Sequence, residues 1–178
     1  ELSKDAQTAY DAGAKGVMMF RWGLSNFIDF NKLNTHEITP SYGDSVSINS
    51  ILAASASLKK YIEDKGVLPK FVTVGNFNYT VPQFLYLMTK ATEGIANGNL
   101  KAITAILVNA SSKTSGDVIN KQLVKSEFVS LAKTLSSYMS ANGIAPGNVS
   151  STLGDIKYES LIYAYARVLS YYQSNSAL

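Results

Sequence analysis

Two tyrosines are each followed, four residues later, by a cation. Lys90 follows Tyr86, and Arg167 follows Tyr163, a spacing that makes the two side chains neighbours on a helix surface. A tyrosine ring can stack on the C–H face of a sugar, and a nearby cation can pair with a carboxylate. Gln83, one turn before Tyr86, would extend the polar side of the same face. We therefore predict that these five residues form a ligand-binding face.

The same tyrosines also have a purely structural interpretation. If the helix that carries Tyr86 is buried on all sides, Tyr86 packs in the core beneath the first helix or the hairpin, and Tyr163 does the same in its own helix. Matching residues at matching positions are expected of a core as much as of a binding site. The sequence leaves both interpretations open.

The sequence offers little material for catalysis or metal binding. It contains no cysteine and a single histidine, His36, next to Glu37. The lack of cysteine excludes a thiol nucleophile, a disulfide framework and most structural zinc sites. One histidine beside one carboxylate falls short of the three or four convergent ligands that a metal site needs. We predict no catalytic residue, no metal site and no cofactor, and hence no enzymatic activity within these residues.

Most landmarks of the segment from Ile51 to Lys90 reappear further along the chain at a constant offset. The offset is 77 residues, the separation of Leu58 and Leu135. So long a period indicates two copies of one module rather than a tight solenoid. The matching residues are Leu58, Tyr61, Gly66, Pro69, Val72, Tyr86 and Lys90 in the first copy, and Leu135, Tyr138, Gly143, Pro146, Val149, Tyr163 and Arg167 in the second.

Each copy begins with a predicted amphipathic helix. In the first copy it spans roughly 18 residues, with Ser45 and Ser47 as capping residues and Gly66 as the stop. In the second copy the expected cap is Ser126 and the expected stop is Asn142-Gly143. The apolar faces are Ile48, Ile51, Leu52, Leu58 and Ile62, and Phe128, Leu131, Ala132, Leu135, Tyr138 and Met139.

A β-hairpin and a second helix complete each copy. Gly75-Asn76 and Gly154-Asp155 are the predicted hairpin turns. Because the glycine comes two residues later in the second copy, we expect a strand slide of two residues there. Thr80 and Gln83 have the spacing of a capping box at the start of the next helix, which we expect to end at Asn97-Gly98.

These elements define an α+β protein, mainly α, with two tandem helix–β-hairpin–helix repeats after an N-terminal helix–strand segment. The repeats cover about residues 46–98 and 124–175. The predicted domains are an N-terminal segment at 1–45, a first repeat at 46–108, a linker at 109–122 and a second repeat at 123–178.

Both copies resemble a known family. The first is similar to the pseudomurein-binding repeat of methanogenic archaea in the run ILAASASLKKYIEDKGVLPKFVTVGNFNYTVPQFLYLMTKA. That repeat couples a helix, a Gly-x-Leu-Pro-x-Tyr/Phe-Val break and a Gln-Phe-Leu-Tyr-Leu helix. The second copy resembles the variant in cell-surface proteins of the same organisms, with Ala-Pro in place of Leu-Pro, in the run SEFVSLAKTLSSYMSANGIAPGNVSSTLGDIKYESLIYAYARVL.

The resemblance implies non-covalent binding to pseudomurein, the methanogen wall polymer of N-acetylated sugars and an aminouronic acid cross-linked by peptides. The expected partner is this polymer, through its glycan or its peptide cross-links. The resemblance also implies an extracellular location, at the cell wall or cell surface, and a role in anchoring a surface protein or a wall enzyme.

Two other functions stay open. Residues 1–33 loosely resemble the end of a TIM-barrel glycoside hydrolase, so the chain could be the C-terminal part of a wall-active hydrolase whose catalytic residues lie upstream. Alternatively, the repeats bind one another in a structural surface-layer or adhesin-like protein. Wall-degrading endoisopeptidases with such repeats use a cysteine-dependent domain, which a chain without cysteine cannot contain.

Charge and hydropathy argue against two kinds of partner. The net charge of +3 is spread without a basic run, so no nucleic-acid footprint is visible. No segment approaches 18 consecutive apolar residues, and we expect no membrane insertion in this segment. Residues 174–178 resemble the entry to another Leu-Pro break, which predicts further repeats or a catalytic domain in the native chain.

Overall fold

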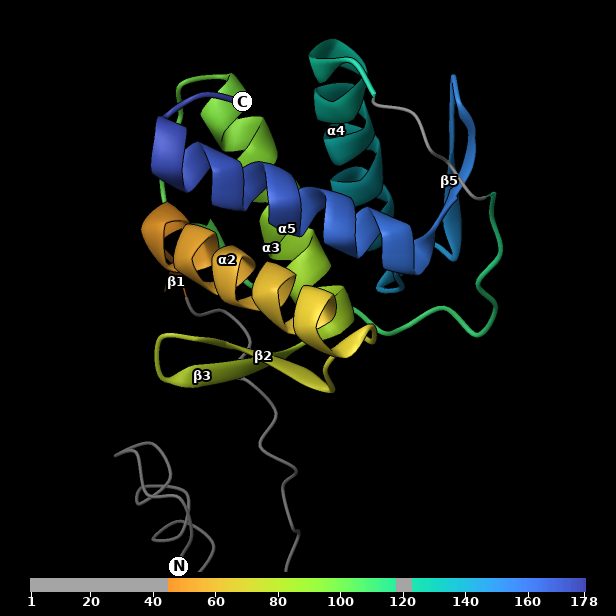
Figure 1. Ribbon diagram of the computed structural model, residues 1–178, viewed down its shortest axis with the longest axis horizontal. Helices are drawn as coiled ribbons and strands as arrows, with labels where there is room; N and C mark the ends of the chain where they lie inside the picture. Colours follow the sequence, from red (N-terminus) through yellow and green to blue (C-terminus); the bar gives the residue numbers. More distant parts are fainter. Residues whose placement is uncertain (1–44, 118–122) are drawn as a thin grey trace, which may run out of the picture. The chain divides into compact units, whose positions relative to one another are not determined.

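The elements follow one another in the order that the duplication predicts. Figure 1 shows the computed structural model, which describes residues 45–117 and 123–178. In these residues a helix, a two-stranded hairpin and a second helix occur twice. The predicted class, α+β and mainly α, is confirmed. Residues 1–44, which hold the predicted N-terminal helix–strand segment and the barrel-like residues 1–33, lie outside the described part of the chain.

The first long helix, α2, spans Ile48–Lys65. The Ser47 hydroxyl caps it by accepting a 3.1 Å hydrogen bond from the Ser50 amide, which satisfies one of the free N–H groups of the first turn. Gly66 ends the helix in the left-handed conformation, with φ 70, and its amide donates to the Ile62 carbonyl at 2.8 Å. The predicted length, the Ser47 cap and the Gly66 stop of this helix are confirmed, but Ser45 lies in a short strand and does not cap the helix.

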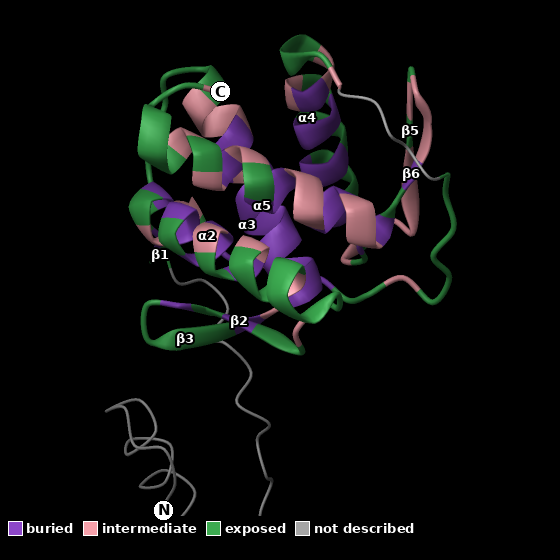
Figure 2. Cartoon of the chain, viewed as in Figure 1, coloured by how far each residue is buried: buried purple, intermediate pink, exposed green. Residues whose placement is uncertain are grey.

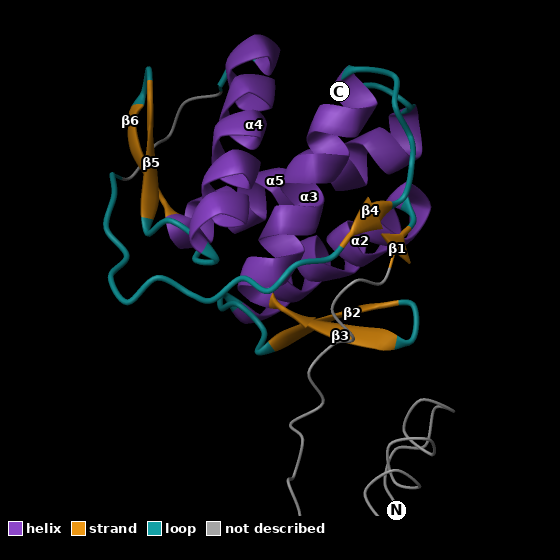
Figure 3. Ribbon diagram, turned by 180° about the vertical axis from the view of Figure 1, so that it is seen from behind, coloured by secondary structure: helices purple, strands orange, loops and turns teal. Residues whose placement is uncertain are grey.

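The first hairpin pairs β2 (Phe71–Val74) with β3 (Phe77–Thr80). Its turn is the predicted Gly75-Asn76, and Gly75 has φ 61, a conformation that costs glycine little and other residues more. A further short pair joins β1 (Ser45–Val46) to β4 (Ile103–Thr104). Figure 3 shows this pair beside α2, where it ties the start of the first repeat to the chain that follows its second helix.

Helix α3 spans Val81–Ala96 and begins with the predicted capping box. The Thr80 amide donates to Gln83 Oε1 at 2.9 Å, and the Gln83 amide donates to Thr80 Oγ1 at 3.4 Å. Two donors of the first turn are thereby satisfied reciprocally. The helix ends at Asn97, and Gly98 follows with φ 67, as the sequence predicts.

The second repeat follows the first at the offset of 77 residues, up to the start of its second helix. Its elements are α4 (Lys125–Asn142), β5 (Asn148–Ser151), β6 (Gly154–Lys157) and α5 (Tyr158–Asn175). Gly143 ends α4 with φ 65, as predicted. The predicted cap is wrong: α4 starts before Ser126, and no side chain caps its first turn.

The turn predicted for the second hairpin is also wrong. Val149 pairs with Ile156, the same register as the pair Val72–Tyr79 in the first hairpin. The turn therefore lies at residues 152–153, and the expected two-residue slide is absent. Gly154 is the first residue of β6 and has φ 114. A glycine is therefore needed at this position for a reason other than forming the turn.

The two repeats are interleaved. Helix α2 packs along α5, α3 packs against α4, and α3 also crosses α5 (Figure 1). Helices of the same repeat contact each other less. The first helix of each repeat therefore covers the second helix of the other. The described residues of both repeats belong to one compact unit, and the boundaries predicted for the two repeat domains and the linker remain predictions.

A shared hydrophobic core results from this exchange. Figure 2 shows buried residues on the helix faces that are turned toward one another, and along most of α3. Each large apolar side chain that is fully buried contributes about 1.5–3 kcal/mol. The most buried are Ile51, Phe84, Leu85, Leu87 and Met88 from the first repeat, and Leu135, Met139, Leu161, Ile162 and Leu169 from the second. Among the described helices, none is long and apolar enough to cross a membrane.

The chain between the repeats runs over the second repeat. Asn109 pairs with Ile144, and Asp117 pairs with Ile156 on the outer edge of β6. Two glycines make this approach possible, because a Cβ on Gly147 would lie 1.9 Å from the Lys113 carbonyl oxygen, and a Cβ on Gly154 would lie 2.6 Å from Asp117 Oδ2. The first repeat has Lys70 and Phe77 at the two glycine positions. These side chains would prevent a connecting segment from packing against the first hairpin in the same way.

Candidate functional site

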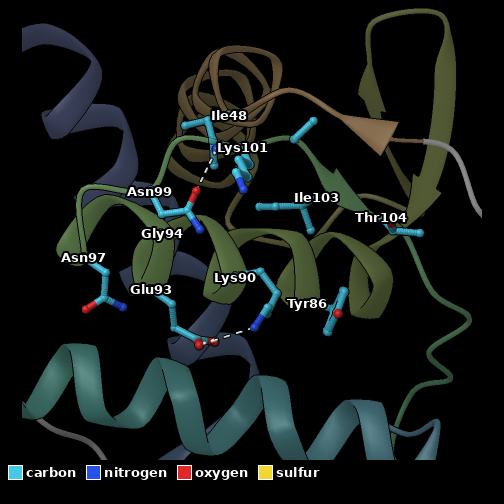
Figure 4. Close-up of a pocket in the computed structure, with 11 residues that line it drawn as sticks. Ile48, Tyr86, Lys90, Glu93, Gly94, Asn97, Asn99, Lys101, Ile103 and Thr104 are labelled. Carbon is cyan, nitrogen blue, oxygen red and sulfur yellow. Dashed lines mark hydrogen bonds and ion pairs between the residues drawn. The ribbon is translucent and has the colours of Figure 1, made fainter.

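A groove lies between α3 and the chain that leaves it. Its volume is about 410 Å³, within the range of about 300–1,000 Å³ that is usual for ligand sites. Tyr86, Lys90 and Glu93 line it from α3, and the other side is lined by Asn97, Asn99 and residues 101–104 (Figure 4). Ile48, the first residue of α2, adds an apolar surface. Two of the five predicted site residues, Tyr86 and Lys90, therefore line one groove.

The return of the chain along α3 forms the second wall of the groove. After Gly98 the chain reverses, and the Asn99 amide donates to the Gly94 carbonyl at 2.8 Å. A Cβ on Gly94 would lie 2.5 Å from the Asn99 carbonyl oxygen, so a glycine is required for this close approach. The end of α3 places Asn97 on the groove, and the returning chain places Asn99 and Lys101 there.

Two lysines give the groove its positive charge. Lys90 Nζ lies 3.3 Å from Glu93 Oε2, and the side chain of Lys90 remains 37% exposed. Glu93 is held from the other side as well, because the Ser136 hydroxyl of α4 donates to its Oε1. Lys101 is exposed and has no ion-pair partner among residues 45–117 and 123–178. The groove therefore holds two ammonium groups against one carboxylate.

Amide groups complete the polar lining. Asn99 Oδ1 accepts a 3.3 Å hydrogen bond from the Lys101 amide (Figure 4), which leaves its Nδ2 able to donate to a ligand. Asn97 is exposed at the end of α3. Side-chain amides donate and accept at once, so together with the lysines they suit a ligand that carries both carboxylate and amide or hydroxyl groups.

The remaining predicted residues lie elsewhere. Gln83 is only 1% exposed, and its carbonyl oxygen accepts from both the amide and the hydroxyl of Thr80. It therefore does not extend the polar side of the groove. Tyr86 is 8% exposed, so its ring forms part of the groove wall while most of it packs in the core. For this tyrosine the structural interpretation accounts for most of the side chain.

Tyr163 and Arg167 take part in a set of contacts that joins α5 to α2. The Tyr163 hydroxyl donates to Glu63 Oε1 of α2 at 2.8 Å, and the Arg167 guanidinium lies 5.6 Å from the centre of the Tyr163 ring. Lys59 pairs with the same Glu63 at 2.8 Å. The hydrogen bond that Tyr163 donates to the Glu63 carboxylate raises the pKa of Tyr163, and the charges of Arg167 and Lys59 oppose this rise. The hydrogen bonds from Lys59 and Tyr163 lower the pKa of Glu63.

The two tyrosine–cation pairs therefore have different structural roles, although they occupy matching sequence positions. The first pair lines a groove, and the second joins α5 to α2 and contributes nothing to that groove. The sequence analysis does not single out Lys101, Asn97 or Asn99, because the pattern at Asn97-Gly98 indicates only the end of a helix. The pattern Asn-Gly-Asn-Leu-Lys offered one signal, a concentration of polar side chains directly after the helix that carries Lys90.

Comparison of the chain with protein-family models, with curated proteins and with solved structures finds no match.

Proposed function

We propose that this chain binds pseudomurein non-covalently and anchors a surface protein or a wall enzyme to the envelope of a methanogen. The binding carries no catalytic step in these residues. The proposal unites the resemblance of the two repeats with the groove at α3, and the chain would act outside the cell, at the wall.

The groove is the observation that carries the proposal. Lys90 and Lys101 supply two cations, of which only Lys90 has a carboxylate partner among the described residues. A uronic acid or a peptide carboxylate would supply the second negative charge, and charge-assisted hydrogen bonds of this kind are stronger than neutral ones. Asn99 would hydrogen-bond an N-acetyl group, and the partly exposed Ile103 offers apolar surface to the C–H face of a sugar.

The groove lysines provide the test. The variant Lys90→Ala plus Lys101→Ala removes both cations from the groove, and the measurement is the depletion of protein from solution by isolated pseudomurein sacculi. Loss of two charge-assisted contacts of about 1.5 kcal/mol each predicts binding at least tenfold weaker than that of the unmodified chain. Thermal unfolding should be nearly unchanged, because both side chains reach the surface.

A control variant separates groove chemistry from net charge. Lys60→Ala plus Lys133→Ala removes the same charge from exposed positions outside the groove. We expect this variant to bind within about twofold of the unmodified chain, a free-energy change of about 0.4 kcal/mol. If both variants lose binding to the same extent, the wall attracts the chain by net charge alone. The groove is then not the binding site.

A further inference from the structure

Two tyrosine positions recur at the offset of 77 residues, and the structure uses them in opposite ways. Tyr86 is buried, and the Tyr163 hydroxyl is occupied by its hydrogen bond to Glu63. Tyr61 of α2 and Tyr138 of α4 are 40% and 45% exposed. Among the described residues, neither of these two rings stacks on another side chain and neither hydroxyl has a hydrogen-bond partner. Each repeat thus presents one free tyrosine at the same position.

The neighbours of the two tyrosines also match in chemistry. Four residues before each tyrosine is a hydroxyl side chain, Ser57 or Thr134, and each hydroxyl donates to the carbonyl one turn further back at 3.2 Å. The oxygen of each hydroxyl therefore keeps lone pairs that can accept from a ligand. Four residues after each tyrosine is a donor at the last residue of the helix, Lys65 or Asn142. One N–H of Asn142 donates to the Tyr138 carbonyl at 2.8 Å, which leaves the second N–H for a ligand. Residues at this spacing share one helix face.

Packing does not require tyrosine at these positions. The apolar residue after each helix stop, Val67 or Ile144, commonly contacts the helix residue that Tyr61 or Tyr138 occupies. Any large apolar side chain could make that contact, and Leu would do so without exposing a polar group. An aromatic ring with a free hydroxyl, kept at 40–45% exposure in both repeats, is instead suited to stacking on a flat apolar surface with polar edges.

We propose that Tyr61 and Tyr138 are two equivalent stacking positions for pyranose rings, one on the first helix of each repeat. The proposal rests on the proposed function, because the sugar would belong to the wall glycan. Ser57 or Thr134 would accept from a sugar hydroxyl or amide, and Lys65 or Asn142 would donate to a sugar oxygen. The two positions, together with the groove at α3, give the chain several contacts with one polymer, which raises its avidity.

The test compares substitutions that keep and that remove the ring. Tyr61→Leu plus Tyr138→Leu keeps an apolar contact behind the helix stop but removes both aromatic faces, whereas Tyr61→Phe plus Tyr138→Phe keeps the faces. The readout is the binding isotherm on isolated pseudomurein sacculi. We expect the leucine pair to bind at least tenfold more weakly than the unmodified chain and the phenylalanine pair to bind within about threefold of it.

Tyr171 supplies the matched control. It is 59% exposed, and the first repeat has Gly94 at the corresponding position, so it is a tyrosine without a repeated counterpart. Tyr171→Leu should leave the isotherm unchanged. Thermal unfolding curves that overlay that of the unmodified chain would establish that the leucine pair is folded.

The outcomes separate this inference from the proposed function. If the unmodified chain binds sacculi and the leucine pair binds equally well, the stacking positions are wrong and the wall-binding function stands. A loss in the phenylalanine pair as large as in the leucine pair also overturns stacking, because the rings are then not what matters. If the unmodified chain does not bind sacculi, both proposals fall.

Discussion

The hydroxyl of Tyr163 lies 2.8 Å from Glu63 Oε1 and joins the second helix of the second repeat to the first helix of the first. A hydrogen bond between residues 100 positions apart cannot form within a single repeat. The Ser136 hydroxyl and the Glu93 carboxylate make the complementary link, from α4 to α3. Both links follow from the interleaved packing, in which each repeat supplies the cover for the helices of the other.

The first prediction concerns the titration of Tyr163. Glu63→Gln removes the charge that raises the pKa of Tyr163, so this pKa should fall toward the ordinary value near 10. Arg167→Ala should have the opposite effect, because the guanidinium favours the phenolate. The Tyr163 ring resonance, followed by NMR as pH rises, measures both shifts. An unchanged Tyr163 titration in Glu63→Gln would mean that the hydrogen bond does not form in solution.

The same shift predicts how stability depends on pH. Because the folded pKa of Tyr163 lies above the unfolded value, the hydrogen bond stabilises the fold fully below about pH 10. That contribution is lost as pH rises through the folded pKa. Denaturant unfolding above pH 10 should therefore show a steeper loss of stability in the unmodified chain than in Tyr163→Phe, which has no proton to lose.

A second prediction follows from the interleaving. A fragment of residues 45–108 leaves the apolar faces of α2 and α3 without α5 and α4, and a fragment of residues 109–178 has the reverse deficit. Each fragment alone should show little helix by circular dichroism, since isolated helices of this length are marginal in water. An equimolar mixture should recover the helical signal and a cooperative melt. Either fragment folding alone as a monomer would contradict the shared core.

A third prediction uses the glycine under the connecting segment. Gly147→Ala places a methyl group against the Lys113 carbonyl and should cost about 2 kcal/mol of stability. The connecting residues 109–117 should also become more sensitive to limited proteolysis. Gly66→Ala is the control: its Cβ would meet nothing within 4 Å, but its φ is 70, so it should cost about 1 kcal/mol without exposing the segment. Equal cleavage in both variants would count against the packing described for Gly147.

A fourth prediction separates capping from binding at Gln83. Gln83→Ala removes the acceptor of the Thr80 amide and hydroxyl, while the bond from the backbone amide of residue 83 to Thr80 remains, and should destabilise the fold by about 1 kcal/mol. Gln83→Glu retains an acceptor for the Thr80 amide and should cost less. Both variants should bind pseudomurein sacculi as the unmodified chain does, once measured at a temperature where both are folded. A binding loss in Gln83→Glu without a stability loss would return this residue to the ligand-binding face.

Local signals predicted much of the fold. Ser47 and Gly66 bound α2, Thr80 and Gln83 begin α3, and Gly75-Asn76 turns the first hairpin, because each depends on backbone conformation and hydrogen bonds within a few residues. The prediction for the second hairpin is wrong because Gly154-Asp155 has the residue types of a hairpin turn, whereas Gly154 lies in β6 and allows the close approach of Asp117. A contact 37 residues away leaves no mark on local sequence.

Local sequence signals do not predict how the two repeats pack together or where most of the groove residues lie. An apolar stripe shows which helix face is buried, but the stripe of α2 does not show that α5 covers it. The fate of the two tyrosine–cation pairs depends on that arrangement: Tyr163 meets Glu63 only because α5 lies on α2. Lys101 joins Lys90 only because Gly94 lets the returning chain approach α3.

The most direct test of the account is an equilibrium binding isotherm of the unmodified chain on purified pseudomurein sacculi. The account predicts saturable binding that soluble wall fragments compete away. It also predicts that binding weakens as salt is raised, because Lys90 and Lys101 meet carboxylates at a partly exposed groove. No saturable depletion of the chain from solution, at any concentration where it stays monomeric and folded, would contradict the central claim that it is a pseudomurein-binding protein.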